Sequence, residues 1–376
     1  MPLRALARIN LAAIERNCVR LMRGLGPEAG LAAVVKADGY GHGATPSARA
    51  ALAGGASWIA VATAREAEAL RRDGIDERLL VMGALSPDEL DVAVAAAADV
   101  VAWRHPFVAA LAERPAAERP LRVHVKLDSG MGRLGTRDPD EARRVAEATA
   151  AAPGLELVGA MTHFATADDP DDGGFFSAQL ARFADWAAGL KRDHPDIVVH
   201  AANSAATLRE ARSHFDLVRC GIAIYGMDPF HQDPALRDLE PALELRSYVA
   251  DLKPCLPGES AGYGRRFVAR DDTVLGVLPI GYGDGVRRAL SDNADVLVAG
   301  RRRPLVGTIS MDNLTVDLGA RPEVGPGTPA VLIGVDGGDR LTAEEMARRV
   351  GTINYEITCG LTPRVPRVYH RDGEPA

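Results

Sequence analysis

The sequence predicts an α/β protein with two domains, a (β/α)8 barrel of the TIM type followed by a mostly β domain. Between residues 30 and about 230, eight short β-branched runs alternate with alanine-rich amphipathic stretches. The runs are continuously apolar, as is typical of parallel strands buried on both faces. Beyond Pro241 the pattern changes to alternating apolar and polar residues separated by glycine and proline, which indicates antiparallel strands.

Eight strands alternating with helices match a closed barrel, in which each connection is a right-handed crossover. An open doubly wound sheet has the same periodicity and is the alternative. Its usual fingerprint G-x-G-x-x-G is missing after the first run, which favours the barrel. The predicted strands are Ala33–Ala37, Trp58–Ala62, Leu79–Gly83, Val100–Arg104, Arg122–Asp128, Leu157–Phe164, Ile197–Asn203 and Leu217–Tyr225. The predicted helices include Ala64–Arg72, Pro87–Ala98, Pro139–Ala152, Phe175–Arg192 and Ser204–His214. Capping signals open two of them, Ser86-Pro87-Asp88 and Asp138-Pro139.

The second domain is expected to be mostly antiparallel over about 130 residues. Its predicted strands are Leu243–Leu252, Thr273–Pro279, Val296–Val298, Leu314–Asp317 and Ala330–Val335. Only Ala343–Val350 has the pattern of a helix in this part of the chain. We assign residues 1–238 to the barrel and 239–376 to the β domain, with about the first ten residues free to pack against the latter.

Composition excludes several classes of protein. The 376 residues carry a formal charge of -7 with scattered basic residues, so we expect neither nucleic acid nor a membrane surface as a partner. The four cysteines lie far apart, which argues against a metal site, and we predict none. Neither a membrane span nor a secretory signal is recognisable, so a cytoplasmic location is expected.

Lysine is rare in this chain, and two of its lysines occupy informative positions. Of 44 basic residues only Lys36, Lys126, Lys191 and Lys253 are lysines. Lys36 and Lys126 stand at the ends of the first and fifth predicted strands. In a barrel these ends form the face that carries the active site. A lysine amine can lose its proton and attack a carbonyl to give a Schiff base, whereas arginine stays protonated.

Other polar residues follow the remaining strands at the same face. They are His163 after the sixth strand, Asn203 and Ser204 after the seventh, and Arg219 with Gly221 and Ile222 at the eighth. The loops after strands seven and eight often bind phosphate in barrels. A solvated rim without a ligand is the alternative interpretation for each residue taken alone.

Taken together, these segments closely resemble the motifs of the alanine racemase family, in the family's order and over almost the whole chain. The segment around Lys36 is similar to the family's cofactor-lysine motif. The matching segments are Ala33–Gly43 (AVVKADGYGHG), Lys126–Gly135 (KLDSGMGRLG), Thr162–Ala165, Asn203-Ser204, Arg219–Gly226, Gly262–Arg265, Gly281–Gly285, Ser310–Asp312 and Arg364–Arg367.

The resemblance implies a fold-type III enzyme dependent on pyridoxal 5'-phosphate (PLP) that works as a homodimer with shared active sites. Lys36 would hold the cofactor and act as the base on the D side, and Tyr263 of the other subunit would be the base on the L side. Arg133 and Met311 would contact the substrate carboxylate, and Lys126 would be carbamylated. The implied cofactor-binding residues are Lys36, Tyr40, His163, Asn203, Ser204, Arg219, Gly221, Ile222 and Tyr355.

The implied activity is the interconversion of L- and D-alanine for cell-wall precursors. Arg219 would face the pyridine nitrogen and keep it unprotonated, and His163 would carry part of its cationic influence to Tyr263. Three departures from the family pattern are Phe267, where relatives often have tyrosine, Cys220, where many have proline, and Thr308, where arginine is common. Thr308 leaves the substrate range open.

Three alternatives remain at this stage. One is a broad-specificity amino-acid racemase of the same architecture, and another is a non-catalytic PLP carrier built on a lone barrel. The third is a decarboxylase of the same fold type, which usually has an acidic residue where this chain has Arg219. The β domain with Tyr263 and Met311 argues against a carrier, since a carrier needs neither a second base nor a substrate clamp.

Overall fold

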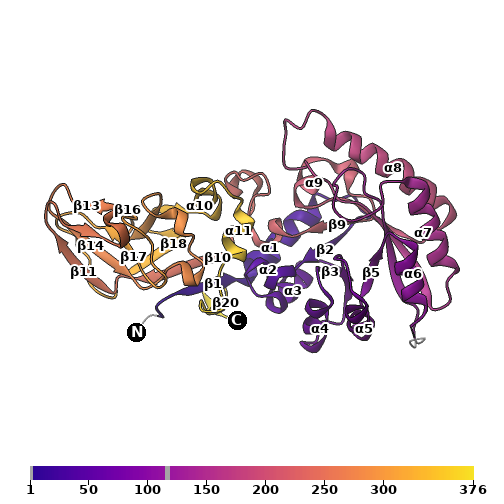
Figure 1. Cartoon of the computed structure of the whole chain (residues 1–376), viewed down its shortest axis with the longest axis horizontal. Helices are drawn as coiled ribbons and strands as arrows, with labels where there is room; N and C mark the ends of the chain where they lie inside the picture. The colour runs from indigo at the N-terminus through magenta and orange to yellow at the C-terminus, as the bar shows by residue number, and fades with distance from the viewer. Residues whose placement is uncertain (1–2, 115–118) are drawn as a thin grey trace. The chain divides into compact units, whose positions relative to one another are not determined.

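The computed structural model describes residues 3–114 and 119–376, and Figure 1 labels most of their helices and strands. The chain divides into two compact units by its internal contacts. One, here called the barrel unit, comprises Glu15–Gly39 and Ala44–Ile224. The other, here called the β unit, comprises the chain up to Ile14, Tyr40–Gly43 and Tyr225–Ala376. Residues 1, 2 and 115–118 of the predicted first domain lie outside the described residues.

Within its described residues, the barrel unit contains an eight-stranded parallel sheet in the order β8-β7-β6-β5-β4-β3-β2-β9. Backbone hydrogen bonds from Asp216 N to Val199 O (3.0 Å) and from Arg219 N to Ala202 O (2.9 Å) join the two ends of this order. The predicted (β/α)8 barrel is therefore confirmed. Its strands are β2 (Gly30–Val34), β3 (Trp58–Val61), β4 (Arg78–Val81), β5 (Asp99–Ala102), β6 (Leu121–Lys126), β7 (Leu155–Met161), β8 (Val198–His200) and β9 (Leu217–Cys220).

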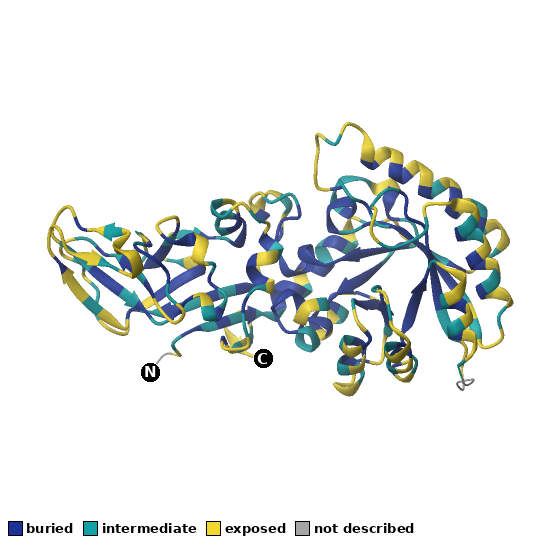
Figure 2. Cartoon of the chain, viewed as in Figure 1, coloured by how far each residue is buried: buried dark blue, intermediate teal, exposed yellow. Residues whose placement is uncertain are grey.

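Helices cover the barrel strands, and several begin at the predicted caps. Ser86 accepts a hydrogen bond from Glu89 N, and the Glu89 side chain accepts one from Ser86 N, which forms a capping box. Figure 2 shows these helices exposed on their outer faces around buried strands. The helices are α1 (Leu11–Arg23), α3 (Ala44–Ala53), α4 (Ala64–Arg72), α5 (Pro87–Ala95), α6 (His105–Ala112), α7 (Pro139–Ala151), α8 (Phe175–Asp193) and α9 (Ser204–Arg209).

The predicted helix Ser204–His214 is shorter than expected. The α-helix α9 ends at Arg209 because Glu210 adopts an extended conformation with φ -148° and ψ 104°. A 3-10 turn, η1 (Ala211–Ser213), follows it, and the Glu210 side chain accepts a hydrogen bond from Arg212 N at its start. The carboxylate thus caps a new turn where the helical periodicity predicted continuation.

The β unit is built on a sheet in the order β16-β15-β18-β10-β1-β20-β21, with β19 paired to β18. A smaller sheet has the order β11-β14-β17, and β12 pairs with β13. The strands are β1 (Leu6–Asn10), β10 (Leu243–Tyr248), β11 (Asp251–Cys255), β12 (Ser260–Ala261), β13 (Phe267–Val268), β14 (Thr273–Leu278), β15 (Asp295–Val298), β16 (Arg301–Pro304), β17 (Leu314–Asp317), β18 (Pro329–Asp336), β19 (Asp339–Leu341), β20 (Arg367–Arg371) and β21 (Glu374–Pro375).

Two features of the β unit refine the sequence prediction. The N-terminal strand β1 lies inside the main sheet, antiparallel to β10 and parallel to β20. The predicted helix Ala343–Val350 is confirmed as α10 (Ala343–Arg349), but the expectation that it is the only helix here was wrong, because α11 (Asn354–Cys359) follows it. Residue Ile353 before α11 makes no side-chain cap, so the usual start signal is missing.

Within the described ranges, we find no helix with the length and hydropathy needed to cross a membrane.

Candidate active site

The predicted site residues of the barrel unit gather at the C-terminal ends of its strands. Lys36 follows β2 by two residues, Lys126 is the last residue of β6, and Arg219 lies in β9. The amine of Lys126 is exposed to the charges of Arg219, Arg133 and Lys36, so these residues share one electrostatic environment. This is the face of a barrel at which chemistry is usually carried out.

Lys36 is followed by an unusual left-handed turn. Ala37, Asp38, Gly39 and Tyr40 all have φ between 52° and 61°. Such a conformation costs roughly 1–2 kcal/mol for each residue that carries a Cβ. Hydrogen bonds from Ala37 N to Glu66 Oε1 (2.7 Å) and from Ala44 N to Asp38 Oδ1 (3.0 Å) hold the turn on both sides. A strained turn maintained in this way is typical of functional sites.

Lys126 is buried in an environment that disfavours its charge. Only 4% of its surface is exposed. Burial, together with the positive charges of Arg219, Arg133 and Lys36, lowers the pKa of its amine to about 7, although Asp128 acts in the opposite direction. The amine therefore loses its proton far more readily than an ordinary lysine does.

Arg219 is the centre of a buried hydrogen-bond network. Its Nη1 donates to His200 Nδ1 (2.9 Å), and its Nη2 donates to the carbonyls of Thr162 (2.8 Å) and Ala201 (3.0 Å). The Nη2 also lies 3.3 Å from His163 Nδ1. Burial lowers the pKa of Arg219 to about 10, so its guanidinium stays charged at neutral pH. Burial and the charge of Arg219 lower the pKa of His163 well below its usual range.

Backbone N–H groups and a hydroxyl lie together where β9 ends. Ser204 Oγ accepts hydrogen bonds from Gly221 N (3.1 Å) and Ala223 N (3.3 Å). The side chain of Asn203 caps α9 by accepting a hydrogen bond from Ala206 N (3.0 Å). A 3-10 turn, η2 (Ile222–Tyr225), begins directly after Gly221. The structure thus brings Asn203, Ser204, Gly221 and Ile222 to one place, in an arrangement that suits an anion.

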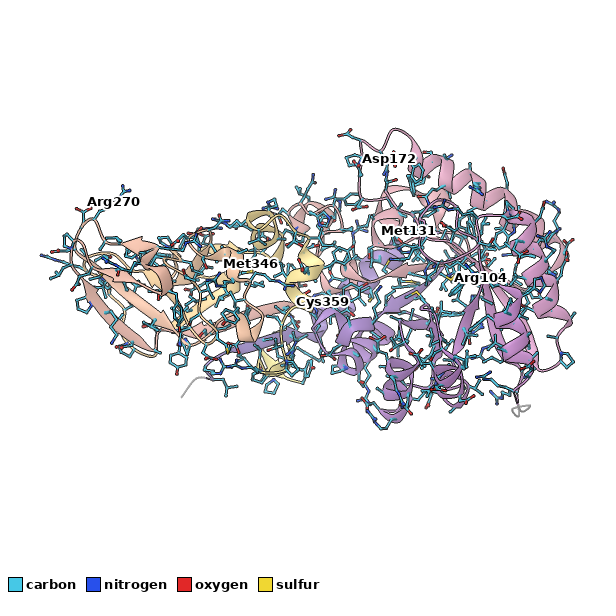
Figure 3. All side chains as sticks on the ribbon, in the orientation of Figure 1. Arg104, Met131, Asp172, Arg270, Met346 and Cys359 are labelled. Carbon is cyan, nitrogen blue, oxygen red and sulfur yellow. The ribbon has the colours of Figure 1, made fainter. Side chains whose placement is uncertain are left out.

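The loop after β6 carries Arg133 and is organised by Asp128. The carboxylate of Asp128 accepts hydrogen bonds from Gly130 N and Gly132 N, each at 3.0 Å, and pairs with Arg137 (3.3 Å). Gly130 and Gly132 have φ of 147° and 72°, values that favour glycine. Arg133 is exposed on this loop, near Met131, which Figure 3 labels.

The other predicted residues belong to the β unit, and two of them meet there. The Tyr40 and Tyr355 rings lie 5.9 Å apart, and Tyr40 also packs 5.2 Å from the Tyr225 ring. Tyr263 and Met311 are exposed by 73% and 51%.

Two models of protein families match the chain. The model "Alanine racemase, N-terminal domain" matches residues 9–229, and "Alanine racemase, C-terminal domain" matches residues 242–369. The chain belongs to the alanine racemase family. The resemblance seen in the sequence motifs is therefore confirmed.

Alanine racemases with known names and structures resemble this chain over nearly its whole length. Alanine racemase 1 of Bacillus subtilis (strain 168) is 40% identical over 375 residues, which cover 98% of this chain and 93% of the relative. The enzyme of Geobacillus kaustophilus (strain HTA426) is 40% identical over 97% of this chain and 94% of its own length. The structure of alanine racemase from Streptomyces lavendulae has a TM-score of 0.90 at 38% identity, covering 98% of each chain. That from Bacillus anthracis with bound L-Ala-P has a TM-score of 0.91 at 35% identity, covering 100% of this chain and 97% of its own.

Sequence reasoning missed three polar residues inside the barrel of this alanine racemase family member. Asp99, His124 and His200 are fully buried and connect to Arg219. They stand within predicted apolar strands or next to them, and a polar residue in such a run is the signal that was available. No group of three or more His, Cys, Asp or Glu residues suited to a metal ion occurs in the part of the chain that the structure describes.

Proposed function

We propose that this chain is an alanine racemase that interconverts L-alanine and D-alanine with the help of PLP. The observation that carries the proposal is the cationic face formed by Lys36, Lys126 and Arg219 at the C-terminal ends of the barrel strands. A lysine amine beside other cations and shielded from water loses its proton readily and becomes a nucleophile toward a carbonyl. The family relationship and the bound L-Ala-P of the Bacillus anthracis relative support this reading.

The residues of the site fit PLP by their donor chemistry. We assign Ser204, Gly221 and Ile222 to the phosphate, because a hydroxyl and the N–H groups at the start of a helical turn are the donors that a phosphate needs, although the N–H of Gly221 donates to Ser204 Oγ in this structure. Arg219 offers only N–H groups to a ring nitrogen, because a guanidinium has no acceptor. Lys36 supplies the amine for covalent attachment. We include Tyr40 and Tyr355 in the phosphate site, and we assign His163 and Asn203 to positions beside the cofactor.

When bound beside these residues, PLP would supply an electron sink that makes the α-proton of alanine acidic. Racemisation then requires a proton acceptor and a proton donor on opposite faces of the α-carbon. We assign Lys36 to the D face, where its Nζ takes or returns the proton. We assign Tyr263 of the second subunit to the L face, where its Oη does the same. Free lysine and tyrosine side chains lose their protons only near pH 10, so a site that uses both as bases needs positive charge nearby.

The substrate carboxylate is assigned to Arg133 and Met311. A guanidinium binds a carboxylate through two parallel N–H donors, which fixes the orientation of the substrate. The deprotonated amine of Lys126 is suited to take up carbon dioxide and become an anion. The carbamate then compensates the charges of Arg133 and Arg219, whose positions it stabilises.

The proposal extends to the assembly and the cellular role. We infer a homodimer in which the β domain, placed at 239–376, supplies Tyr263 to the barrel of its partner, placed at 1–238. The product D-alanine serves peptidoglycan synthesis in the cytoplasm. A broader substrate range is the second candidate, because Thr308 replaces the usual arginine, and its Oγ1 donates to Tyr263 O (2.8 Å) beside the proposed base.

A reduction experiment tests the cofactor assignment. Purified protein treated with borohydride should carry pyridoxyl on the peptide that contains Lys36, detected by mass spectrometry. Lys36→Ala should lose both the label and the yellow colour. Lys191→Ala should keep both. Lys191 lies in α8 and pairs with Asp216, which stands just before β9 begins, at the opposite end of this strand from the proposed site. A label on another lysine, or none, contradicts the proposal. A racemisation assay over a panel of L-amino acids then separates an alanine enzyme from a broad-specificity one.

A further inference from the structure

A continuous line of polar side chains runs through the interior of the barrel from Arg219 to Asp99. Arg219 Nη1 lies 2.9 Å from His200 Nδ1, His200 Nε2 lies 2.9 Å from His124 Nδ1, and His124 Nε2 lies 3.2 Å from Asp99 Oδ2. All four residues are at least 97% buried. The interior of such a barrel is usually filled by layers of branched apolar side chains, so this line is a departure that needs a reason.

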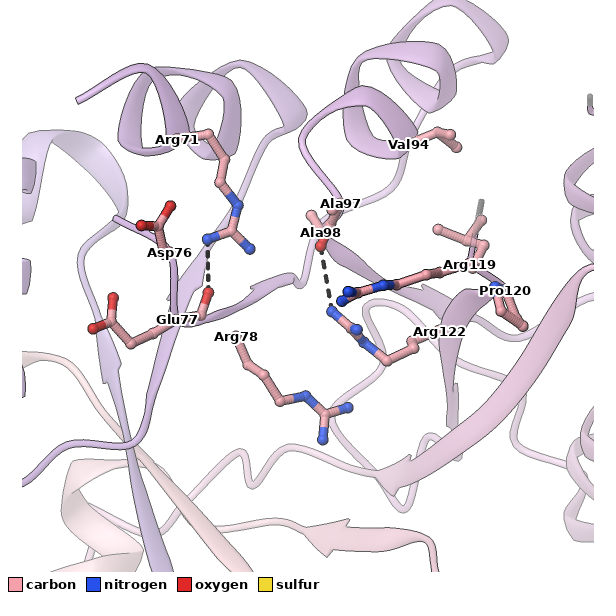
Figure 4. A pocket seen from close by; sticks show the side chains of 11 residues that line it. Arg71, Asp76, Glu77, Arg78, Val94, Ala97, Ala98, Arg119, Pro120 and Arg122 are labelled. Atoms are coloured by element: carbon pink, nitrogen blue, oxygen red, sulfur yellow. Dashed lines mark hydrogen bonds between the residues drawn. The ribbon is translucent and has the colours of Figure 1, made fainter. Parts of the chain in front are cut away.

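The line connects the two ends of the barrel. Asp99 is the first residue of β5 and pairs with Arg78 (2.8 Å) and Arg122 (2.5 Å). Arg78 is the first residue of β4, and Arg122 is the second residue of β6. Figure 4 shows both arginines lining a cavity of about 650 Å³ at this end, where Arg122 also donates to the carbonyl of Ala97. Arg219 and the proposed cofactor site lie at the opposite end, where the strands finish.

The guanidinium of Arg219 determines where the protons of the two imidazole rings lie. A guanidinium donates hydrogen bonds and cannot accept them, so His200 Nδ1 facing Arg219 must be unprotonated. The proton of His200 then resides on Nε2 and is donated to His124 Nδ1. By the same reasoning the proton of His124 resides on Nε2 and is donated to Asp99. Every hydrogen bond therefore points from Arg219 toward Asp99.

The charges agree with this direction. Burial lowers the pKa of both His124 and His200, which keeps the imidazoles neutral. Burial alone would raise the pKa of Asp99, but the hydrogen bond from His124 and the charges of Arg78 and Arg122 outweigh it, so the pKa lies below its usual range. A cation thus stands at one end and an anion at the other, with two neutral rings oriented between them.

We propose that Asp99, His124 and His200 are positioning residues that fix the orientation and the protonation of Arg219 from the far end of the barrel. Asp99 accepts the last hydrogen bond of the line and thereby sets the tautomer of both imidazoles. The lone pair of His200 then faces the guanidinium, stabilises its charge and holds one of its two amino groups in place. This inference rests on the proposed contact of Arg219 with the cofactor, but its test reads the imidazole protons themselves.

The primary experiment is ¹⁵N NMR of the holoenzyme labelled at histidine, with signals assigned through His124→Gln and His200→Asn. Both rings should be neutral and protonated at Nε2 from about pH 6 to about pH 9, across the ordinary histidine pKa of about 6.5. A charged ring, or a proton on Nδ1 of either residue, overturns the proposal. The result is independent of whether Lys36 is labelled by borohydride, so a failure of the proposed function is recognised separately.

Asp99→Asn provides the second test. Arg78 and Arg122 should attract the amide oxygen and turn the NH2 group toward His124, which forces both rings into the Nδ1–H tautomer and places an N–H against Arg219. We expect kcat to fall about ten- to a hundredfold, as when an outer hydrogen-bond partner of a site is removed, with a smaller change in KM. Arg122→Lys keeps a cation beside Asp99 and should leave tautomers and kcat close to those of the wild type. Unchanged tautomers in Asp99→Asn contradict the mechanism.

A pair of substitutions at His124 covers the case in which Asp99→Asn does not fold. Gln retains one acceptor and one donor, whereas Leu fills a similar volume with neither. We expect His124→Gln to keep at least ten times more kcat than His124→Leu, in keeping with the effect of outer hydrogen-bond partners. Equal kcat values for the two variants would mean that His124 serves packing alone and would refute the proposal.

Discussion

Single residues of this chain owe their chemistry to desolvation by their neighbours. Lys126 and Arg219 are both cations by sequence, but burial affects them differently, because the ordinary pKa of lysine is lower than that of arginine. The pKa of Lys126 falls to about 7, whereas that of Arg219 falls only to about 10. Near neutral pH the neutral, nucleophilic form of Lys126 is therefore populated, whereas Arg219 remains a charged hydrogen-bond donor.

The lowered pKa of Lys126 makes its reaction with carbon dioxide dependent on pH. Only the neutral amine reacts, so the carbamate should form at pH values above about 7 and be lost as the pH falls below the pKa. Carbon-13 NMR after incubation with labelled bicarbonate should show one slow-exchanging signal at pH 8. Four charged groups act on this amine, namely Arg219, Arg133 and Lys36, which lower the pKa, and Asp128, which raises it. Lys126→Ala should lose the signal, and Lys191→Ala should keep it. A signal that persists in Lys126→Ala would refute the assignment.

Replacing the proposed L-side base should affect the two directions of the reaction unequally. Tyr263→Phe removes the hydroxyl but keeps the ring, so the change is confined to proton transfer. Loss of a general base typically costs 10²- to 10⁴-fold, and we expect at least about a hundredfold loss of α-proton exchange from L-alanine. Exchange from D-alanine, measured by deuterium incorporation, should fall much less. Tyr282→Phe is the matched control, and equal losses in both directions would contradict the two-base scheme.

Among the secondary-structure elements, β6 and β7 are adapted to the polar line within the barrel. The register between these strands shifts at Val123 and His124. Gly159 on β7 faces His124, and a Cβ at Gly159 would lie 1.9 Å from His124 Nδ1. The φ of Gly159 is not positive, so glycine is needed here for space and not for its backbone freedom.

Because β6 and β7 approach each other closely at Gly159, the addition of one methyl group there should destabilise the protein. Gly159→Ala should displace His124 and lower the free energy of unfolding by about 1–3 kcal/mol, the usual cost of overpacking. Gly189→Ala in α8 is the control, because its added Cβ has its nearest neighbour 3.7 Å away at Arg192. This second change should raise the free energy of unfolding by up to about 1 kcal/mol. Urea denaturation measures both, and an unaffected Gly159→Ala would show that His124 is not held in place.

At the scale of the whole molecule, the two units are interlaced along the chain. The β unit takes its first strand from the N-terminus and a four-residue segment, Tyr40–Gly43, from between two parts of the barrel unit. Its main sheet is therefore incomplete without β1, which pairs with both β10 and β20. The N-terminal strand therefore stabilises a sheet whose other strands lie in the C-terminal part of the sequence.

A cavity in β1 should therefore weaken the β unit selectively. Ile9 is fully buried and lies opposite Leu243 of β10 and Tyr369 of β20. Ile9→Ala should lower the free energy of unfolding by about 2–5 kcal/mol. Hydrogen exchange followed by mass spectrometry should show faster exchange in β10 and β20 than in the wild type, and little change in β6 and β7. Leu3→Ala, at a residue that is 54% exposed, should have no such effect. Uniformly faster exchange would contradict this selectivity.

The proposed sharing of active sites predicts complementation between subunits. Lys36→Ala and Tyr263→Phe homodimers should each be nearly inactive toward L-alanine. Refolding an equimolar mixture should yield mixed dimers with one intact site, and about a quarter of the wild-type activity follows from random pairing, since half the dimers then carry one of two sites. A mixture of Lys36→Ala with Lys36→Met is the control and should remain inactive. No recovery in the first mixture argues against shared sites.

The extent of the sequence-based prediction differs between elements and sites. The helices that begin at Ser86 and Asp138 were predicted because a cap and a following proline act within a few residues of sequence. In contrast, α11 begins without a side-chain cap, and α9 ends early because Glu210 caps a competing turn. The residues at the strand ends were found because a barrel places them at one face. The line from Arg219 to Asp99 was not, because its members come from four separate strands.

The sequence by itself determined the fold class and the family, because strand periodicity, caps and motif spacing are local properties that need no three-dimensional information. Only the tertiary structure decided which charges meet. The pKa of Lys126 and the direction of the hydrogen bonds between Arg219 and Asp99 depend on contacts between strands distant in the chain, and the left-handed turn after Lys36 is held in part by Glu66 of α4. Desolvation and hydrogen-bond direction are properties of these contacts, and no single segment of sequence contains them.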